Sequence, residues 1–251
     1  MIRPDGRAHD DLRPVAWELG YQDWAEGSVL FSMGRTRVLA AASVSEDIPR
    51  WLRGSGRGWV TAEYSMLPRA TAERSAREVS KGRPGGRTQE IQRLIGRSLR
   101  SVTDLTRLGD RTITVDCDVL LADAGTRTAS ITAGYIALAL ALRTLGEQGS
   151  VSGDALTDTV AAVSVGLIEG EAVLDLCYEE DAAVAVDFNV VMTGSGELVE
   201  VQGTAEGQAF SRADLDRVLD LATLGIERLT KLQHEALSSA REPSRSPQAP
   251  A

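Results

Sequence analysis

The sequence predicts an α/β fold in which strand and helix patterns alternate in both halves of the chain. Residues 113–121 alternate between apolar and polar side chains, a period of two that is typical of a strand. A long run of helix-forming residues follows over 129–145. Strand patterns followed by a helix pattern recur after residue 160. This order is consistent with a duplicated α/β unit, although no residue-level repeat supports the duplication.

The composition is that of an ordinary soluble protein. The 251 residues are 43% hydrophobic and 25% charged, enough for a sizeable core in one or two domains. Because neither a signal-peptide pattern nor a run of about eighteen apolar residues is present, we expect no membrane association. Cys117 and Cys177 both fall in apolar strand patterns and are predicted to be reduced core residues of a cytoplasmic protein. With only two histidines and no Cys-x-x-Cys pair, a zinc site or a histidine-based triad is not expected.

The first half is predicted to open with strands joined by glycine turns and then to enter two basic loops. The strand patterns cover residues 15–20, 28–33, 37–44 and 60–65. Residues 50–58 form a glycine-rich basic loop. Residues 68–86 form a long, arginine-rich loop, and loops of this length usually carry function or an interface.

Residues 87–108 have the clearest amphipathic helix pattern, because apolar residues recur at spacings of three and four. Arg87 lies at the start of this predicted helix, where a cation opposes the helix macrodipole. An arginine makes sense there if an anion lies between its side chain and the helix end. The alternative is an arginine that is simply solvated.

Residues 123–125 are predicted to be a turn that joins the strand to the next helix. Gly125 can adopt positive φ, and the first helical turn after it has unpaired N–H groups and the positive end of the macrodipole. Arg127 can hold a phosphate through two parallel hydrogen bonds. The same turn carries three hydroxyl groups, those of Thr126, Thr128 and Ser130. We interpret this turn as an oxyanion site with phosphate as ligand; the alternative is a well-capped core helix with a solvated arginine.

The second half reads as a block of strands that ends in a helix. The strand patterns cover residues 161–168, 172–178, 186–192 and 198–202, with a hairpin turn signal at 193–196. A capping box at 211–214 opens a helix that is predicted to reach about residue 237. Residues 241–251, rich in Ser, Pro and Ala, are predicted to be a disordered tail.

Asp181 and Asp187 are candidate ligands for a hard metal ion, which favours paired carboxylates. In one straight strand the two side chains would lie roughly 20 Å apart, at about 3.3 Å per residue. A helical turn between them would reduce the rise to about 9 Å. We therefore predict that residues 179–186 are not one straight strand and that the two carboxylates approach each other. The alternative is a hairpin end with solvated acids.

The net charge of −9 hides an asymmetry along the chain. Residues 50–107 contain twelve arginines and one lysine against five acidic residues, a local balance of +8, which leaves −17 for the remainder. This block predicts a surface for a polyanion on one face. Alternatively, its arginines pair with acids of this chain or of a neighbouring subunit, and both interpretations can hold together.

Four stretches together resemble the ribonuclease PH family, phosphate-dependent 3′-exoribonucleases that trim tRNA precursors. The opening RPDGR (3–7) fits as well, and the resemblance runs in order over about residues 1–237. The stretches are MLPRATAER (66–74), GRTQEIQRLIGRSLR (86–100), DCDVLLADAGTRTASIT (116–132) and DFNVVMTGSGELVEVQGTAEG (187–207).

The resemblance implies a fold of two βαβα-type halves packed as one catalytic domain, residues 1–240. It implies that phosphate is the co-substrate, bound at Arg87, Gly125, Thr126 and Arg127. It also implies that Asp181 and Asp187 are catalytic carboxylates associated with Mg²⁺. Ala124 departs from the family pattern, which has glycine at this position. If that position needs positive φ, the alanine costs about 1 kcal/mol.

The family resemblance also implies RNA as a partner and a homohexameric ring, a trimer of dimers, in the cytoplasm. Positions tied to assembly or RNA contact are matched by Arg69, Arg74 and Arg77. The expected reaction releases nucleoside diphosphates from the 3′ end and is reversible as nucleotide addition. A catalytically inactive RNA-binding ring subunit is the alternative, and the retained Arg87, Arg127, Asp181 and Asp187 argue against it.

Overall fold

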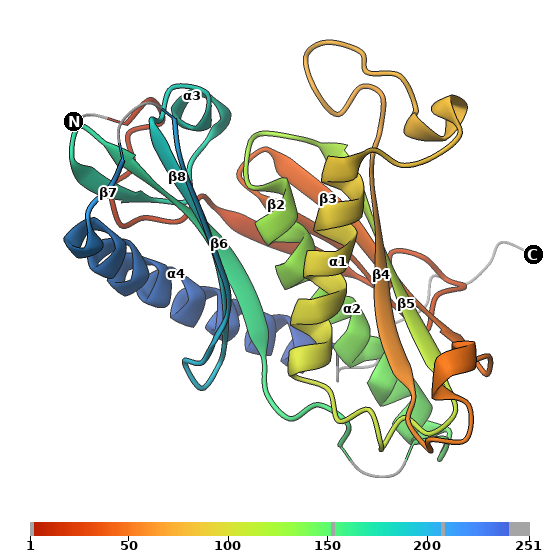
Figure 1. Ribbon diagram of the computed structural model, residues 1–251. Coiled ribbons are helices and arrows are strands. Elements are labelled where there is room, and N and C mark those ends of the chain that lie inside the picture. Colours follow the sequence, from red (N-terminus) through yellow and green to blue (C-terminus); the bar gives the residue numbers. More distant parts are fainter. Residues whose placement is uncertain (1–2, 152–153, 207–208, 241–251) are drawn as a thin grey trace, which may run out of the picture.

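Two β-sheets with helices packed between and beside them make up the molecule (Figure 1). The computed structural model describes residues 3–151, 154–206 and 209–240, so the predicted tail at 241–251 lies outside the described residues. The first sheet has the strand order β1-β2-β3-β5-β4, and the second has the order β7-β6-β8-β9. The predicted α/β class, with strands before helices in each half, is confirmed.

The first half contains five strands and two long helices. They are β1 (Val15–Leu19), β2 (Gly27–Met33), β3 (Thr36–Ser45), β4 (Trp59–Met66), α1 (Gly86–Ser101), β5 (Thr112–Leu121) and α2 (Thr126–Glu147). All neighbouring strands are antiparallel except β4 and β5, which are parallel. Parallel neighbours need a crossover connection, and α1 supplies it. As a result α1 and α2 begin at the same end of the sheet (Figure 1).

The second half contains an antiparallel sheet, one short helix and one long helix. They are β6 (Val160–Ile168), β7 (Glu171–Leu174), α3 (Tyr178–Asp181), β8 (Val186–Thr193), β9 (Leu198–Ala205) and α4 (Arg212–Ser239). The predicted hairpin turn joins β8 to β9, where the Gly196 N–H donates to the Thr193 carbonyl. The predicted capping box opens α4, because Ser211 Oγ accepts from the Asp214 N–H at 3.1 Å and Asp214 Oδ2 accepts from the Ser211 N–H at 2.8 Å.

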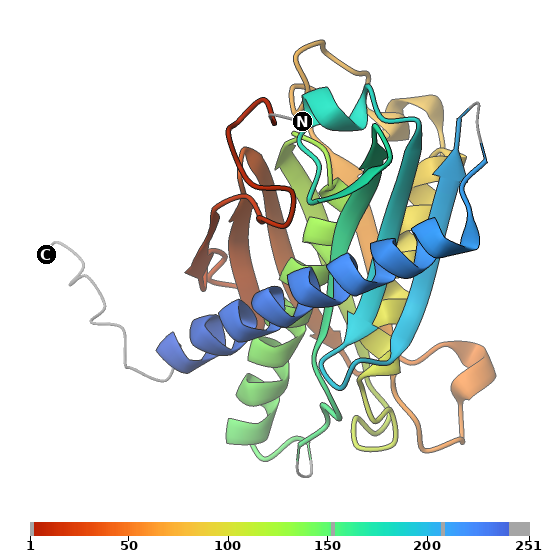
Figure 2. The same ribbon diagram turned by 90° about the vertical axis from the view of Figure 1, so that its left-hand side faces the viewer.

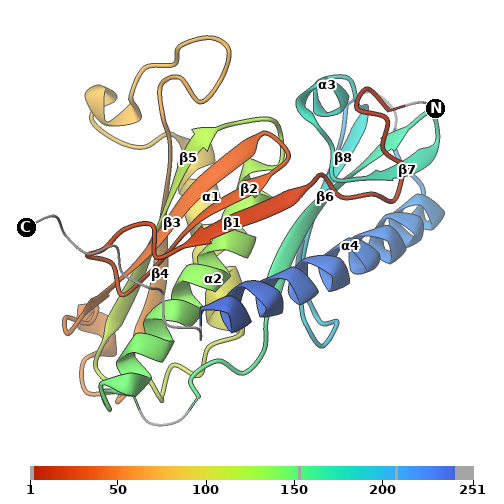
Figure 3. The ribbon, with the colours of Figure 1, turned by 180° about the vertical axis from the view of Figure 1, so that it is seen from behind.

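Helix α2 is the core helix shared by both halves. It contacts β2 and β3 of the first sheet and β6 of the second (Figure 3). By length and composition α2 could cross a membrane, but 78% of its apolar window is buried inside the molecule. Strand β6 lies between α2 and α4 (Figure 2), and its residues 160–166 are all buried. The second sheet is therefore fixed to the first through α2.

Helix α1 ends earlier than its apolar spacing predicts, at Ser101 rather than near residue 108. Beyond it the backbone turns to pair with residues 155–157: the Asp104 N–H donates to the Ala155 carbonyl at 2.8 Å, and the Thr157 N–H donates to the Val102 carbonyl at 2.9 Å. Val102, Leu105 and Leu108 remain buried. The spacing correctly indicated burial, while these tertiary hydrogen bonds end the helix.

The strand predicted over residues 172–178 also stops early, at Leu174. Asp175 adopts a φ of 52°, which lies in the left-handed region and breaks the strand. Cys177 is therefore the residue before α3 and not a strand residue, and its N–H donates to Glu180 Oε2 at 2.9 Å. Cys117 does lie in a strand, and both cysteines are buried and free, as predicted.

Candidate active site

Helices α1 and α2 begin at the same end of the molecule (Figure 1). A cavity of about 320 Å³ lies at that end. Its wall combines the β5–α2 turn and the start of α1 from the first half with α3 and the start of β8 from the second. All six residues predicted to bind phosphate or to act in catalysis line this one cavity. They are Arg87, Gly125, Thr126, Arg127, Asp181 and Asp187.

The β5–α2 turn presents main-chain N–H groups to the cavity. Gly125 precedes α2 with a φ of 61°, and Ala124 has a φ of 57°, so both lie in the left-handed region. No side chain caps α2, and we find no acceptor for the N–H groups of Thr126, Arg127 and Thr128 within the part of the chain that the structure describes. An uncapped helix N-terminus of this kind favours an anion.

Only one of the three hydroxyls predicted at this turn lines the cavity. The Thr126 hydroxyl bonds the Tyr64 hydroxyl at 2.8 Å. The other two are buried and donate to carbonyls of the same helix or its cap. Thr128 Oγ1 bonds the Gly125 carbonyl at 2.9 Å, and Ser130 Oγ bonds the Thr126 carbonyl at 2.7 Å.

Two arginines bring positive charge to the cavity from different helices. Arg127 Nη1 donates to Gln202 Oε1 at 2.8 Å and lies 3.4 Å from Glu90 Oε1. Arg87 is exposed in the first turn of α1, and none of the ion pairs between described residues involves it. Arg127 shares its charge with one carboxylate, that of Glu90, at 3.4 Å, and Arg87 has no acidic partner among the described residues, so positive charge remains for a bound anion.

The chain between the two aspartates is not one straight strand, as predicted. Asp181 ends α3, a turn continues to Val184, whose N–H donates to the Glu180 carbonyl at 2.9 Å, and Asp187 is the second residue of β8. Burial, and then the nearby charge of Asp187, raises the pKa of the Asp181 carboxyl. Burial also raises the pKa of Asp187. The two carboxylates therefore line one cavity and repel each other.

The carboxylate pair of Asp181 and Asp187 suits Mg²⁺ better than a metal that needs three or more protein ligands. Among residues 3–151, 154–206 and 209–240, no group of three or more His, Cys, Asp or Glu side chains could hold a metal on its own. Mg²⁺ usually keeps several waters and is bound by one or two carboxylates together with substrate phosphates. Asp181 and Asp187 meet that requirement, and a cation would relieve their mutual repulsion.

The cavity also has lining residues beyond the six predicted from the sequence. Asn189 lies two residues after Asp187 on β8, so the period of two puts both on the same face, and this signal was available in the sequence. Ser164 is paired with Asn189 across β6 and β8 and depends on the sheet register. Five further lining residues come from the β4–α1 region, the end of β5, α3 and β8. They are Met66, Thr71, Ala122, Tyr178 and Phe188.

The three arginines predicted for RNA contact or assembly all lie on the loop between β4 and α1, which projects beyond the sheets (Figure 1). Arg69, Arg74 and Arg77 are exposed and do not line the 320 Å³ cavity. Arg69 lines a neighbouring cavity of about 660 Å³, which shares Thr71, Ala122 and Tyr178 with the first. Arg77 lines a third cavity, of about 380 Å³, together with Arg87. The loop thus connects the candidate site to two further hollows.

Part of the basic block of residues 50–107 is neutralised within the chain. Arg97 forms an ion pair with Glu200, and Arg107 Nε lies 3.2 Å from Asp104 Oδ2. The Arg100 guanidinium lies 4.3 Å from the centre of the Trp59 ring and donates to the Val60 carbonyl. These three arginines therefore have partners within the chain. The arginines of the β4–α1 loop, in contrast, are exposed.

Comparison with known proteins assigns the family. The models of the 3′ exoribonuclease family match residues 11–143 as domain 1 and residues 158–224 as domain 2. The chain is 60% identical to ribonuclease PH of Crocosphaera subtropica over 95% of this chain and 98% of that protein. It is 60% identical to ribonuclease PH of Frankia casuarinae over 94% of both chains. The crystal structure of rice (Oryza sativa) Rrp46 has the same fold, with a TM-score of 0.76 and 21% identity over 94% of this chain and 100% of that one. The chain therefore belongs to the ribonuclease PH family of 3′ exoribonucleases.

Proposed function

We propose that the protein removes nucleotides from the 3′ ends of tRNA precursors by phosphorolysis and releases them as nucleoside diphosphates. The observation that carries this proposal is the combination, in one cavity, of an uncapped helix N-terminus, two arginines and a pair of carboxylates. The helix end and the arginines suit an inorganic phosphate, and the carboxylates suit the metal and the scissile phosphodiester.

In the proposed mechanism, inorganic phosphate is bound by Arg87, Arg127 and the N–H groups at the start of α2. One phosphate oxygen attacks the phosphorus of the last phosphodiester, and the bond from this phosphorus to the 3′ oxygen of the preceding nucleotide breaks. The products are a nucleoside diphosphate and an RNA one nucleotide shorter with a 3′-hydroxyl. Since no covalent enzyme intermediate is needed, the chain contributes positioning and stabilisation of charge. The same geometry serves nucleotide addition in reverse.

Asp181 and Asp187 would hold Mg²⁺, which supplies neutralisation of the oxygens of the scissile group when it is bound. The two carboxylates themselves fix where the metal and the RNA end can lie. Their raised pKa values mean that they bind protons more readily than ordinary aspartates, so they should lose metal as the pH falls. Asn189, on the same face of β8, can donate to a phosphate or sugar oxygen.

Arg69, Arg74 and Arg77 are proposed to contact RNA or a neighbouring subunit of a homohexamer in the cytoplasm. Their exposure on a loop that runs along the neighbouring cavities supports a role outside the reaction itself. A ring subunit that binds RNA without chemistry is the competing proposal. It is disfavoured because Arg87, Arg127, Asp181 and Asp187 all line one cavity.

The decisive experiment identifies the mononucleotide that is released. Single-stranded RNA with a 3′-hydroxyl is incubated with the protein and Mg²⁺, with and without inorganic phosphate. We expect nucleoside diphosphate only when phosphate is present. Nucleoside monophosphate released without phosphate would make the protein a hydrolase, and RNA that is bound but never shortened would support the inactive ring subunit.

A further inference from the structure

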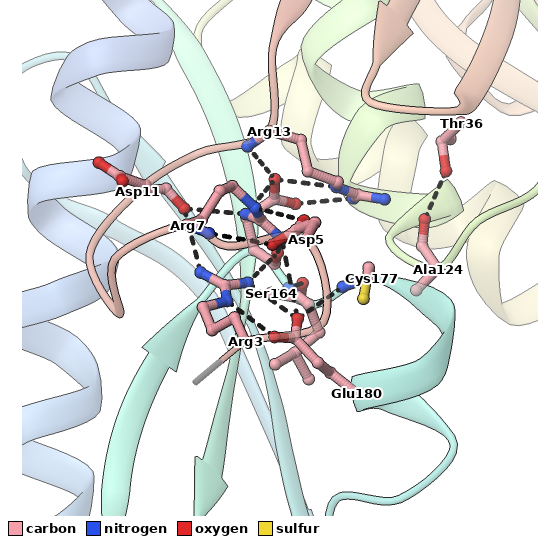
Figure 4. Close-up of polar contacts among 12 residues, drawn as sticks. Arg3, Asp5, Arg7, Asp11, Arg13, Thr36, Ala124, Ser164, Cys177 and Glu180 are labelled. Atoms are coloured by element: carbon pink, nitrogen blue, oxygen red, sulfur yellow. Dashed lines mark hydrogen bonds and ion pairs between the residues drawn. The ribbon is translucent and has the colours of Figure 1, made fainter. Parts of the chain in front are cut away.

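Two buried polar side chains, Arg13 and Thr36, bond the turn that leads into α2. Figure 4 labels both, together with Ala124, to which Thr36 is bonded. Thr36 Oγ1 donates to the Ala124 carbonyl at 2.7 Å and accepts from the Asp123 N–H at 2.9 Å. Arg13 Nη1 donates to the Asp123 carbonyl. Arg13 is 3% exposed and Thr36 is fully buried, and neither lines the cavity. The main-chain groups of this turn are therefore bonded to the scaffold behind it.

Arg13 is itself fixed by a buried acid from the other half of the chain. Its Nε and Nη2 donate to the two carboxylate oxygens of Asp175 at 2.9 and 2.7 Å, and its main-chain N–H donates to Oδ2 at 2.7 Å. Asp175 is 1% exposed and lies in the segment between β7 and α3. A fork-shaped contact of this kind fixes the orientation of the guanidinium as well as its position. Arg13 therefore connects the turn before α2 to the segment that leads to Asp181.

The guanidinium of Arg13 packs directly against Gly125. A Cβ atom at Gly125 would lie 2.9 Å from Arg13 Nη2, so only glycine fits at this close approach. Ala124 and Gly125 are consecutive residues in the left-handed region, a conformation that residues with a Cβ atom avoid and that persists only when its surroundings impose it. Arg13 and Thr36 bond the main-chain groups of Asp123 and Ala124 in this turn.

We propose that Arg13 and Thr36 are positioning residues for phosphate binding. They hold residues 123–125 in place, with Ala124 and Gly125 in the left-handed conformation, so that the first N–H groups of α2 and the side chain of Arg127 face the cavity. This inference rests on the proposed function, because the anion concerned is the phosphate of that same site. It predicts a specific defect: weaker use of phosphate, with the binding of RNA and the rate at saturating phosphate close to those of the parent.

The first test replaces arginine by lysine at two positions of the same cluster. Arg13→Lys keeps the charge but loses the fork that reaches Asp175 and the turn. Arg7→Lys is the matched control, since Arg7 Nη2 donates to the Asp175 carbonyl at 3.0 Å and Arg7 makes no contact with residues 123–125 among its described hydrogen bonds. Nucleoside diphosphate release is measured against phosphate concentration. We expect the KM for phosphate to rise about ten-fold or more in Arg13→Lys and to stay within about two-fold of the parent in Arg7→Lys.

The second test acts on the other side of the turn and is independent of Arg13. Thr36→Val keeps the shape of the side chain but removes the hydroxyl, and Thr36→Ser restores it. The KM for phosphate should rise in Thr36→Val and return toward the parent value in Thr36→Ser, which a purely structural loss would not do. If Arg13→Lys does not fold, the KM for phosphate of the two Thr36 variants alone decides whether the turn is positioned in this way.

Two results would overturn the inference: folded variants with the parent KM for phosphate, or an equal rise in the Arg7→Lys control. A parent enzyme whose activity does not depend on phosphate would instead contradict the proposed function.

Discussion

Ala124 is a residue with a Cβ atom in a conformation that suits glycine. Its φ of 57° costs an L-residue roughly 1–2 kcal/mol relative to the right-handed region. The sequence already identified this position as a departure from the family pattern, and the positive φ shows why glycine would be expected there. Ala124 directly precedes Gly125, the residue from which the turn enters the uncapped helix α2.

Replacing Ala124 by glycine should therefore stabilise the folded protein. We expect the free energy of unfolding to rise by about 0.5–1 kcal/mol, less than the strain itself, because glycine also increases the entropy of the unfolded chain. Ala213→Gly, in the exposed first turn of α4, is the control and should lower the same quantity by up to about 1 kcal/mol. Urea denaturation measures both, and a loss of stability in Ala124→Gly would contradict the strain argument.

Arg127→Ala should weaken phosphate use more than it weakens RNA binding. The variant loses a charge-assisted contact of about 1.5–3 kcal/mol, which corresponds to a rise of roughly ten-fold to a hundred-fold in the KM for phosphate. Arg212→Ala, which removes an exposed arginine that pairs with Asp216, is the control. Steady-state kinetics with either substrate varied would show the difference, and an unchanged KM for phosphate would remove Arg127 from the site.

Asp187→Asn should lower kcat while RNA binding is retained, because the amide keeps the shape but loses the charge that a cation requires. Burial raises the pKa of Asp187 in the parent, so the parent should lose activity on acidification at a higher pH than an ordinary aspartate would cause. The pH profile of kcat and the dissociation constant for RNA are measured together. Parent-like turnover by Asp187→Asn would show that this carboxylate has no role in catalysis.

At the scale of elements, local signals predicted most strands and helices, and tertiary contacts decided where some of them end. The apolar spacing over residues 87–108 continues through Leu105 and Leu108, which are buried although α1 has ended. Its end depends on hydrogen bonds to residues 155–157, about fifty positions further along the chain. Cys177 is a second example. It lies in an apolar sequence pattern that predicts a strand, and it is buried, but Asp175 in the left-handed region ends β7 before it. Apolar patterns indicate which residues are buried, but burial does not specify whether the backbone there is helix, strand or loop.

The candidate site was predictable as far as it is built from local motifs. The turn at Gly125, the arginine at the start of α1 and the two aspartates around one helical turn each have a signal within about ten residues of sequence. The roles of Ser164 and Thr71 as lining residues depend on strand order and loop packing, which only the folded chain provides. Arg13 lies more than a hundred positions from the turn that it supports.

The packing of α4 on the second sheet includes a close approach at Gly225. A Cβ atom at Gly225 would lie 2.8 Å from Leu174 Cδ1, so Gly225→Ala should lower the free energy of unfolding by about 1–3 kcal/mol. Gly146→Ala in α2 is the matched control, because no atom lies within 4 Å of its added Cβ, and it should be neutral or stabilising by up to about 1 kcal/mol. Thermal unfolding compares the two, and equal effects would mean that α4 packs less closely than described.

The charge distribution of the whole molecule supports the prediction that the protein forms a closed assembly. Exposed arginines of the β4–α1 loop lie on a protein with a net charge of −9, and a closed ring can turn such loops toward one shared opening. We predict a hexamer, with a mass by light scattering about six times that of the 26.8 kDa chain. Its affinity for a tRNA precursor should fall steeply with salt, because bound RNA releases counterions. A monomer that trims structured precursors at the full rate would show that the ring is dispensable.

Alanine substitution of Arg69, Arg74 and Arg77 separates the two roles proposed for them. A variant that stays hexameric but binds the precursor with a shallower salt dependence has lost an RNA contact. A variant that dissociates at the same concentration has lost a subunit contact. The mass and the salt dependence measured on the same sample therefore assign each arginine.

Helix α2 is buried on nearly all sides, between a first sheet made of residues before it and a strand, β6, made of residues after it. Synthesis proceeds from the N-terminus, so the nascent chain completes the first sheet and α2 before β6 and α4 have left the ribosome. During that interval the side of α2 that later contacts β6 has no cover, and a helix that is apolar all round is stable only when it is buried. Until β6 has been synthesised, this side of α2 is therefore an exposed apolar surface, and chaperones that bind apolar segments have a defined target there.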